Sequence, residues 1–150
     1  MKQKTLHILL TLTLTLLFSL QMHAQSRYSG YELGLRFGDT YGGEAALDAM
    51  IPFYGNRIHA NLSFHHNGII AAGLYNWRFP IGNGFTFYPG AGGVVSVGET
   101  LLLGVAGEIG AEYSFDIPLT IGLDWRPVLG ILNTSGFGAD GFGLNIRYRF

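Results

Sequence analysis

Three side chains with the chemistry for acyl transfer fall near one another in the alternating pattern of the chain. Asp48, Ser63 and His65 are a carboxylate, a nucleophile and a base, the three groups of a catalytic triad. If their strands pair through a tight turn at residues 54–57, Asp48 lies directly opposite Ser63, and His65 lies two residues further along, about 6.8 Å away. The same groups also form ordinary buried hydrogen-bond networks. We therefore predict no catalytic residues, with an acyl-transfer site as the alternative.

The remaining candidates for chemistry predict no metal and no cofactor. His65 and His66 are adjacent, so on a strand they point to opposite faces and make a poor chelate. A phosphate-binding loop must be followed by a helix. The glycine-rich residues 90–93 are not followed by a helical pattern, so they do not form such a loop. The arginines are scattered and form no basic block, so we also predict no nucleic-acid partner.

The elements that position these residues are eight segments in which apolar and polar residues alternate. Strict alternation is the pattern of a β-strand with two different faces, and a tilted strand crosses a thin bilayer with about 9–11 residues. An Asn67-Gly68 pair predicts a hairpin in which His66 lies opposite Ile69. The longest connection is predicted at residues 127–140. The segments are residues 31–37, 44–53, 58–65, 69–78, 85–97, 101–115, 119–126 and 141–150.

The charged side chains fall on one face of these segments and the large apolar ones on the other. An antiparallel sheet of eight such strands closes into an up-and-down barrel whose interior is just wide enough to be filled by side chains. We predict an all-β transmembrane barrel with apolar residues toward lipid and charges paired in the lumen, and we expect no open pore. The predicted lumen ion-pair residues are Glu32, Arg36, Asp48, Arg78, Glu108, Glu112, Asp124, Arg126, Arg147 and Arg149, with Glu108 opposite Arg126.

Aromatic residues are predicted to gather at the rim that holds both ends of the barrel. An interfacial girdle of this kind is typical of membrane barrels, and the terminal rim is usually the periplasmic one. The predicted girdle comprises Tyr31, Phe53, Trp77, Phe79, Phe85, Phe87, Tyr113, Phe115, Tyr148 and Phe150.

Residues 1–24 have the pattern of a signal peptide. Lys2 and Lys4 precede an apolar run from residue 8 to residue 20, and a small-residue site ends at Ala24. The run is shorter than the roughly 20 residues of a spanning helix, and the chain has no cysteine for a lipid anchor or disulfide. We predict that residues 25–150 form one barrel domain, with seven arginines, ten acids and a net charge of −3.

A soluble exported barrel of lipocalin type is the alternative architecture. Its apolar faces would point inward around an apolar ligand. The same alternation of apolar and polar residues is compatible with this arrangement. The apolar faces carry more bulk than a small lumen holds, and the opposite face has little charge for a surface in water. The membrane barrel is therefore favoured.

Four stretches carry a resemblance to a known family: residues 74–79, 84–93, 110–119 and the closing residues 146–150. With them the chain resembles the small eight-stranded outer-membrane β-barrel proteins of Bacteroidetes-type, Gram-negative bacteria, most of which have no assigned activity. The resemblance implies a porin-like wall, outer-membrane lipid and the outer-membrane assembly machinery as partners, and Tyr148 and Phe150 as the assembly signal. Some barrels that are similar by fold alone modify lipid A by acyl transfer or deacylation, which is the alternative function. The favoured function is structural or interactive.

Overall fold

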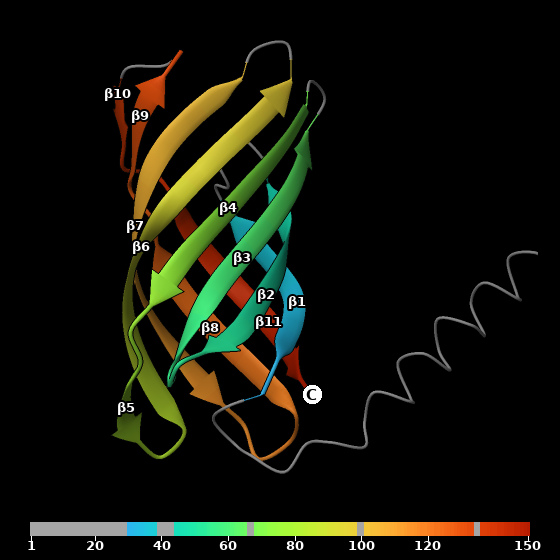
Figure 1. The fold of residues 1–150 in the computed structure, drawn as a ribbon. Coiled ribbons are helices and arrows are strands. Elements are labelled where there is room, and N and C mark those ends of the chain that lie inside the picture. The colour runs from blue at the N-terminus through green and yellow to red at the C-terminus, as the bar shows by residue number, and fades with distance from the viewer. Residues whose placement is uncertain (1–29, 39–43, 66–67, 99–100, 134–135) are drawn as a thin grey trace, which may run out of the picture.

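The computed structural model describes residues 30–38, 44–65, 68–98, 101–133 and 136–150. The predicted signal peptide, His66 and Asn67 lie outside these residues, as does the side chain of His65. No described segment forms a helix long and apolar enough to cross a membrane. The described chain folds into a closed, eight-stranded, antiparallel up-and-down barrel, as the alternation predicts (Figure 1).

The barrel wall is built from eleven strand segments. Eight of them close the ring in the order β1-β2-β3-β4-β6-β7-β8-β11, and β11 pairs with β1. The segments β5, β9 and β10 extend the wall beyond the ring at its two ends (Figure 1). The segments are β1 Glu32–Gly38, β2 Ala45–Phe53, β3 Asn56–His65, β4 Gly68–Asn76, β5 Phe79–Gly82, β6 Phe85–Gly98, β7 Leu102–Ser114, β8 Leu119–Trp125, β9 Val128–Leu132, β10 Gly136–Gly138 and β11 Phe142–Arg149.

Prolines explain why two of the wall strands are divided. Trp77, between β4 and β5, donates to the carbonyl of Pro89 at 3.0 Å, and Gly107 donates to the carbonyl of Pro127, between β8 and β9, at 2.9 Å. Proline has no N–H with which to complete either pair. The register runs on unchanged across both divisions. Physically, β4 with β5 and β8 with β9 are therefore single long strands.

The long connection predicted at residues 127–140 contains two strands that the sequence did not predict. These residues contain β9 and β10, which form a hairpin that continues the wall on β7 and projects at the upper end in Figure 1. Likewise, residues 79–84, which separate two of the predicted segments, contain β5, which lies at the lower end. The sequence of β9 is apolar on both faces, so it lacks the alternation by which the other strands were identified.

Two predicted registers are also wrong, each by two residues. Phe53 pairs with Asn56, so Asp48 lies opposite Asn61 and not opposite Ser63. The central turn residues are Tyr54 and Gly55, both with positive φ, as a two-residue type I′ hairpin requires. In the next hairpin His65 pairs with Gly68, where the sequence predicted His66 with Ile69. A shift of two residues leaves every side chain on its original face.

The faces are oriented as predicted for the membrane barrel. Large apolar side chains such as Leu33, Phe64 and Leu123 are exposed on the outer wall, whereas Arg36, Asp48 and Arg147 are fully buried. The lipocalin-type alternative, which places the apolar faces inside, is therefore wrong. Ring contacts link the aromatic residues near the lower end, through the pairs Phe53–Tyr75, Tyr75–Trp77, Phe85–Tyr113, Tyr113–Phe115 and Tyr148–Phe150.

Candidate functional site

The lumen is filled by a network of charged and polar side chains. Alternation sends every second residue of each strand inward, and these inward positions hold the charges. Among the described residues, the buried charged side chains are Glu32, Arg36, Asp48, Arg57, Glu108, Glu112, Asp124, Arg126, Arg147 and Arg149. A charge without water must be paired to be tolerated. The geometry of these pairs therefore defines what the lumen does.

The upper part of the network is an ion pair between β1 and β8. Arg36 donates from Nε and Nη2 to Asp124 Oδ1, at 3.0 and 2.6 Å, and both side chains are fully buried. Asn145 of β11 donates to the other carboxylate oxygen at 2.7 Å. Arg36 also donates to the carbonyl of Gly141 at 2.9 Å. These bonds join β1, β8 and β11 across the seam where the barrel closes.

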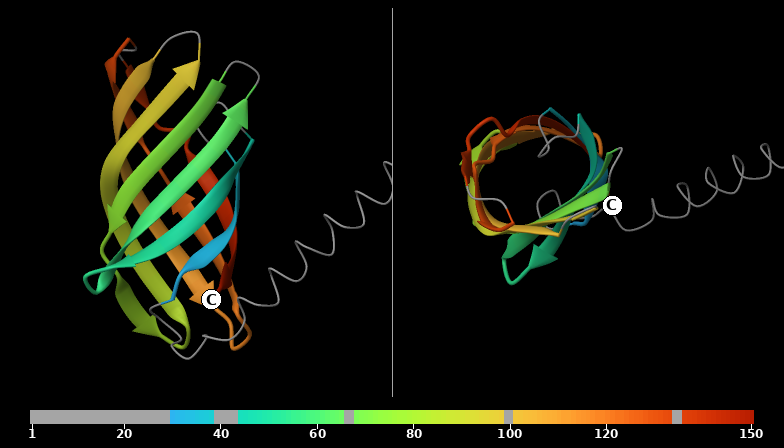
Figure 2. Two further views of the ribbon diagram at one scale, coloured as in Figure 1. Left: turned by 45° about the vertical axis from the view of Figure 1, so that its right-hand side comes forward. Right: turned by 90° about the horizontal axis from the view of Figure 1, so that it is seen from above.

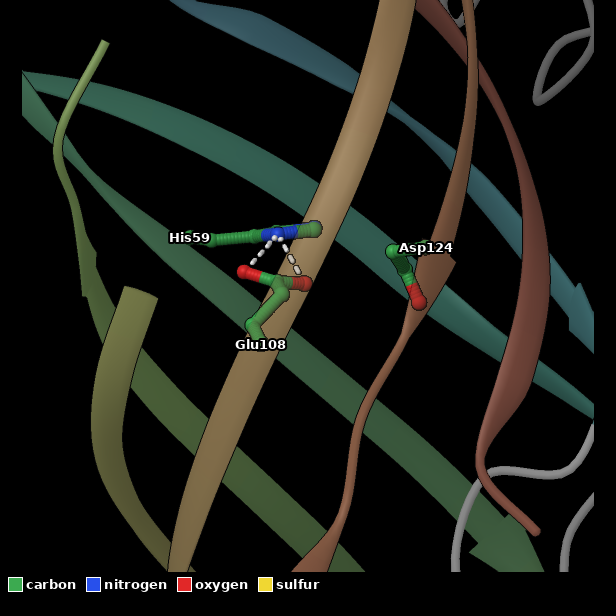
Figure 3. A group of neighbouring side chains, drawn as sticks. All are labelled: His59, Glu108 and Asp124. Atoms are coloured by element: carbon green, nitrogen blue, oxygen red, sulfur yellow. Dashed lines mark hydrogen bonds and ion pairs between the residues drawn. The ribbon is translucent and has the colours of Figure 1, made fainter. Parts of the chain in front are cut away.

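At the centre, His59 of β3 lies between two carboxylates. Its Nε2 is 2.5 Å from Asp48 Oδ1, and its Nδ1 is 2.9 Å from Glu108 Oε1 (Figure 3). Ionised carboxylates only accept hydrogen bonds, so both ring nitrogens must carry a proton when both bonds form. In this arrangement His59 is an imidazolium that balances one buried negative charge.

Arg126 completes the central group. Its Nη2 is 2.5 Å from Glu108 and 3.6 Å from Asp124, and its Nη1 donates to Asn61. Asn61 in turn donates to Asp48 Oδ1 at 2.6 Å. The predicted opposition of Glu108 and Arg126 thus appears as a direct ion pair.

The lower part of the network is organised by Arg147 of β11. Its three guanidinium nitrogens contact Glu32 at 2.8 Å, Asp48 at 3.0 Å and Glu112 at 2.5 Å. Glu112 also receives a fork of two bonds from Arg57, at 2.6 and 2.9 Å. Bidentate pairs of this kind are the strongest protein ion pairs. Arginines from two strands therefore hold one carboxylate.

The two remaining predicted lumen residues lie at the lower rim. Arg149 donates to the carbonyls of Phe115 and Ile117, at 2.5 and 2.7 Å, so it caps the β7–β8 turn. Arg78 is half-buried, and its backbone N–H donates to the side chain of Asn56 at 3.1 Å.

Glycines in the wall make room for the large lumen side chains. A Cβ atom at Gly110 would collide with the Tyr88 ring, and one at Gly143 would collide with the Arg36 guanidinium. Tyr88 is fully buried, and Arg57 lies over its ring at 4.7 Å from the centroid. The glycines on the polar face therefore make a tightly filled lumen possible.

The alternative acyl-transfer site requires Asp48 directly opposite Ser63, and the register of β2 with β3 does not place them so. Ser63 is buried opposite Ala46 and Ile70, while Asp48 bonds to His59, Asn61 and Arg147. The side chain of His65 lies outside the described residues. Asp48 is thus held by structural partners, and its strand places it opposite Asn61.

One group in the lumen has metal-ligand character. His59, Glu108 and Asp124 offer ligand atoms that all lie within 4.8 Å of one another (Figure 3). Arg126 bonds to Glu108 and lies beside Asp124, and its positive charge occupies the place of a metal cation. A divalent ion would have to displace a paired guanidinium, so these residues fit an internal ion-pair network better than a metal centre.

The sequence did not single out His59, Arg57 and Asn61 as parts of the network. Arg57 lies in the turn predicted at residues 54–57, so the sequence gives it no place among the lumen ion pairs. The signal was present, because all three have the strand parity of Asp48 and Ser63 and therefore face the lumen.

Comparison of the chain with protein-family models, with curated proteins and with solved structures finds no match in any of the three.

Proposed function

We propose that the protein is an integral outer-membrane β-barrel of structural or interaction type with a sealed polar lumen. The observation that carries this proposal is the sidedness of the wall. Every fully buried charge of the network lies inside the barrel, while apolar side chains on all eight wall strands are exposed outside. Soluble monomers rarely expose continuous apolar surface beyond a few hundred Å². A closed barrel with this sidedness suits lipid as its surroundings.

The lower end supports an orientation. The closing strand ends there (Figure 1), where the Phe150 N–H donates to the carbonyl of Tyr31 at 2.9 Å. Exposed aromatic side chains are in ring contact, in the pairs Phe53–Tyr75, Tyr75–Trp77 and Phe85–Tyr113. Aromatic girdles lie at membrane–water interfaces, and short turns usually face the periplasm. We infer that both termini are periplasmic after export through the signal peptide of residues 1–24.

The filled lumen supports a role other than conduction. The ion pairs run from Glu32 through Arg147, Asp48, His59, Glu108 and Arg126 to Asp124. Arginine does not release its proton in proteins, so Arg147 and Arg126 interrupt any proton exchange along this chain. The same side chains occupy the space that ions would need. The porin-like character is thus confined to the wall.

The assembly machinery and outer-membrane lipid are the partners that this proposal includes. Tyr148 and Phe150 lie on the outer face of the closing strand with their rings 5.0 Å apart, where a recognition signal is accessible before the barrel closes. The four stretches that resemble the Bacteroidetes-type barrels support the same assignment.

Cell fractionation tests the proposal directly. In a Gram-negative host the mature protein is expected in the outer-membrane fraction, and it should migrate faster on a gel when it is not boiled, because a folded barrel resists detergent. Recovery of mature protein in the soluble periplasmic fraction would refute the membrane location. A Gly110→Pro variant is the control for folding, because proline has no N–H to complete the β6–β7 ladder there. We expect this variant to lose the faster migration of the unboiled protein.

A further inference from the structure

An open groove crosses the outer wall of the barrel and has no role in the lumen network. Its volume is about 560 Å³, and its lining comes from β6, β7, β8, β11 and β1. These strands are consecutive neighbours in the closed ring, which Figure 2 shows from above. The lining includes Phe37, Phe87, Ala111, Leu123, Trp125 and Phe142.

The groove exists because one small residue interrupts a row of large ones. Ala111 of β7 lies opposite Phe87 of β6 on one side and opposite Leu123 of β8 on the other. The row continues through Leu144 of β11 to Phe37 of β1. All five side chains are exposed on the outer wall. Ala111 has only a methyl group where its neighbours carry rings or branched chains, so the row has a hollow at this position.

The side chains of the groove leave no polar group for a ligand to satisfy. The Trp125 Nε1–H donates to the carbonyl of Ala139 at 2.6 Å. Asp124 also lines the groove, but its side chain is fully buried and bonds to Arg36 inside the lumen, so only its backbone reaches the groove. Among the described residues, no buried side-chain donor or acceptor without a partner belongs to the lining. A hydrocarbon is the ligand that matches such a surface, because it brings no polar group that would lose its hydrogen bonds.

The groove has the length and direction of one acyl chain. Neighbouring strands lie about 4.8 Å apart, so the four spacings from β6 to β1 make about 19 Å. One leaflet of the hydrocarbon core is about 15 Å deep. The strands are tilted to the barrel axis (Figure 2), so a row that crosses them is oblique to the membrane as well. The row begins at Phe87, near the lower end of β6, and ends at Phe37, near the upper end of β1 (Figure 1). A chain that descends from a headgroup at the lower rim can therefore follow it.

A second copy of the barrel fits the groove less well than an acyl chain does. A two-fold dimer centred on this face would place the groove of one barrel against the groove of the other. Atoms that line a void have no partner for dispersion contacts. An acyl chain is flexible and can fill the hollow at Ala111.

We propose that the groove binds one acyl chain of a phospholipid from the periplasmic leaflet. Phe87 and Leu123 flank the chain at the hollow. Trp125 and Phe142, whose rings are 6.3 Å apart, line the groove beyond it. This site rests on the proposed membrane location and deepens it, because it names a lipid that stays with the barrel in preference to the lipids of the surrounding bilayer.

The test uses the mature barrel refolded in detergent, with native mass spectrometry to count retained lipid. Didecanoyl- and dipalmitoyl-phosphatidylcholine are offered in equal amounts to the parent, to Ala111→Phe and to Ala60→Phe. Phenylalanine at residue 111 fills the hollow. Ala60 lies outward on β3 between Ala49 and Gly73 and does not line the groove. We expect the parent and Ala60→Phe to retain one dipalmitoyl lipid, with an affinity roughly tenfold lower in Ala111→Phe. Ala111→Leu should be intermediate, and faster migration of the unboiled protein checks that each variant is folded.

The fluorescence of Trp125 locates the retained chain. The sequence has two tryptophans, so Trp77→Phe leaves Trp125 as the single reporter. A phosphatidylcholine with brominated acyl chains, retained in detergent, should quench this fluorescence, and Ala111→Phe should remove the quenching.

Three results would overturn the proposal. They are retention without preference for the longer chain, equal retention by Ala111→Phe and Ala60→Phe, and a dimer that Ala111→Phe dissociates, which would assign the groove to a second copy. A barrel that inserts into vesicles but retains no lipid refutes the groove site alone. Recovery of the mature protein in the soluble fraction refutes the membrane location.

Discussion

The buried pair of Arg36 and Asp124 offers a sharp test of how the lumen is held together. We consider Arg36→Met, Asp124→Leu and the double variant, because these apolar residues approximate the volume of the originals. Both charges are fully buried, 88 residues apart in the chain, and joined by a fork of hydrogen bonds. The pair links the first strand of the barrel to the seventh wall strand and tests the tertiary fold.

Each single change leaves one charge buried without its main partner. Removing one member of a buried pair typically destabilises a protein by about 3–5 kcal/mol, which is more than a hundredfold in the folding equilibrium. Asp124 keeps Asn145 at 2.7 Å and Arg126 at 3.6 Å after Arg36→Met, so we expect that loss near the lower value. Replacing both members by apolar residues is often close to neutral. The double variant should therefore lose at least about 2 kcal/mol less than the two single losses combined.

The assay is urea unfolding of the mature barrel in lipid vesicles, followed by tryptophan fluorescence. A control cycle combines Arg36→Met with Glu32→Gln, whose side chain bonds to Arg147 and lies four residues away along β1, about 13 Å. Changes at that distance usually add within about 0.5 kcal/mol. If the Arg36 and Asp124 changes were also additive, the two charges would not stabilise one another, and the ion-paired lumen would be refuted.

Four further predictions test the filled lumen, the assembly signal, the alternative function and the absence of conduction. Gly110→Ala forces a Cβ atom into the ring of Tyr88 and should cost about 1–3 kcal/mol, partly restored by Tyr88→Leu; an unchanged urea midpoint would contradict this. Tyr148→Ala with Phe150→Ala should lower the amount of barrel in the outer membrane, and unchanged levels on an immunoblot would argue against the signal. Lipid A from cells with Ser63→Ala should give the same mass spectrum as lipid A from cells with the parent protein, whereas a difference between the two spectra would support the acyl-transfer alternative. The folded protein should be silent in planar bilayers, and discrete conductance steps would contradict the sealed lumen.

The sequence was sufficient for the number of ring strands and for the orientation of their faces. Both follow from a period of two, which places Asp124 and Arg147 on the same side as every other strand charge. The register was not predictable in this way. Asn61 lies opposite Asp48, where the sequence predicted Ser63, so the observed pairing differs from the predicted one by two residues. A difference of two residues leaves each side chain on the same face. The pattern of alternation cannot distinguish these registers.

The site was less predictable than the fold because its contacts cross the lumen. His59 on β3 contacts Glu108 on β7, and Arg147 on β11 contacts Glu112, which is also on β7. These strands are not neighbours in the ring, so cross-strand pairing rules do not connect them. The contacts depend on the curvature of the closed wall and on glycines that leave space for long side chains. Neither is encoded in the pattern of a single strand.

The buried charges specify which way the barrel faces more than they stabilise it. Buried ion pairs often contribute little compared with apolar residues of the same volume, so stability alone does not explain why a lumen should carry Arg36, Arg126 and Arg147. At the proposed membrane location, a barrel turned inside out would place these arginines in lipid, where each costs about 2–4 kcal/mol near the midplane. It would also leave Asp48 and Glu108 without their partners. The inverted arrangement is thus penalised many times over, while the observed one pairs nearly every charge internally. An alternating sequence could in principle form a barrel with either face outside. We infer that the polar network selects the barrel whose apolar face is outside.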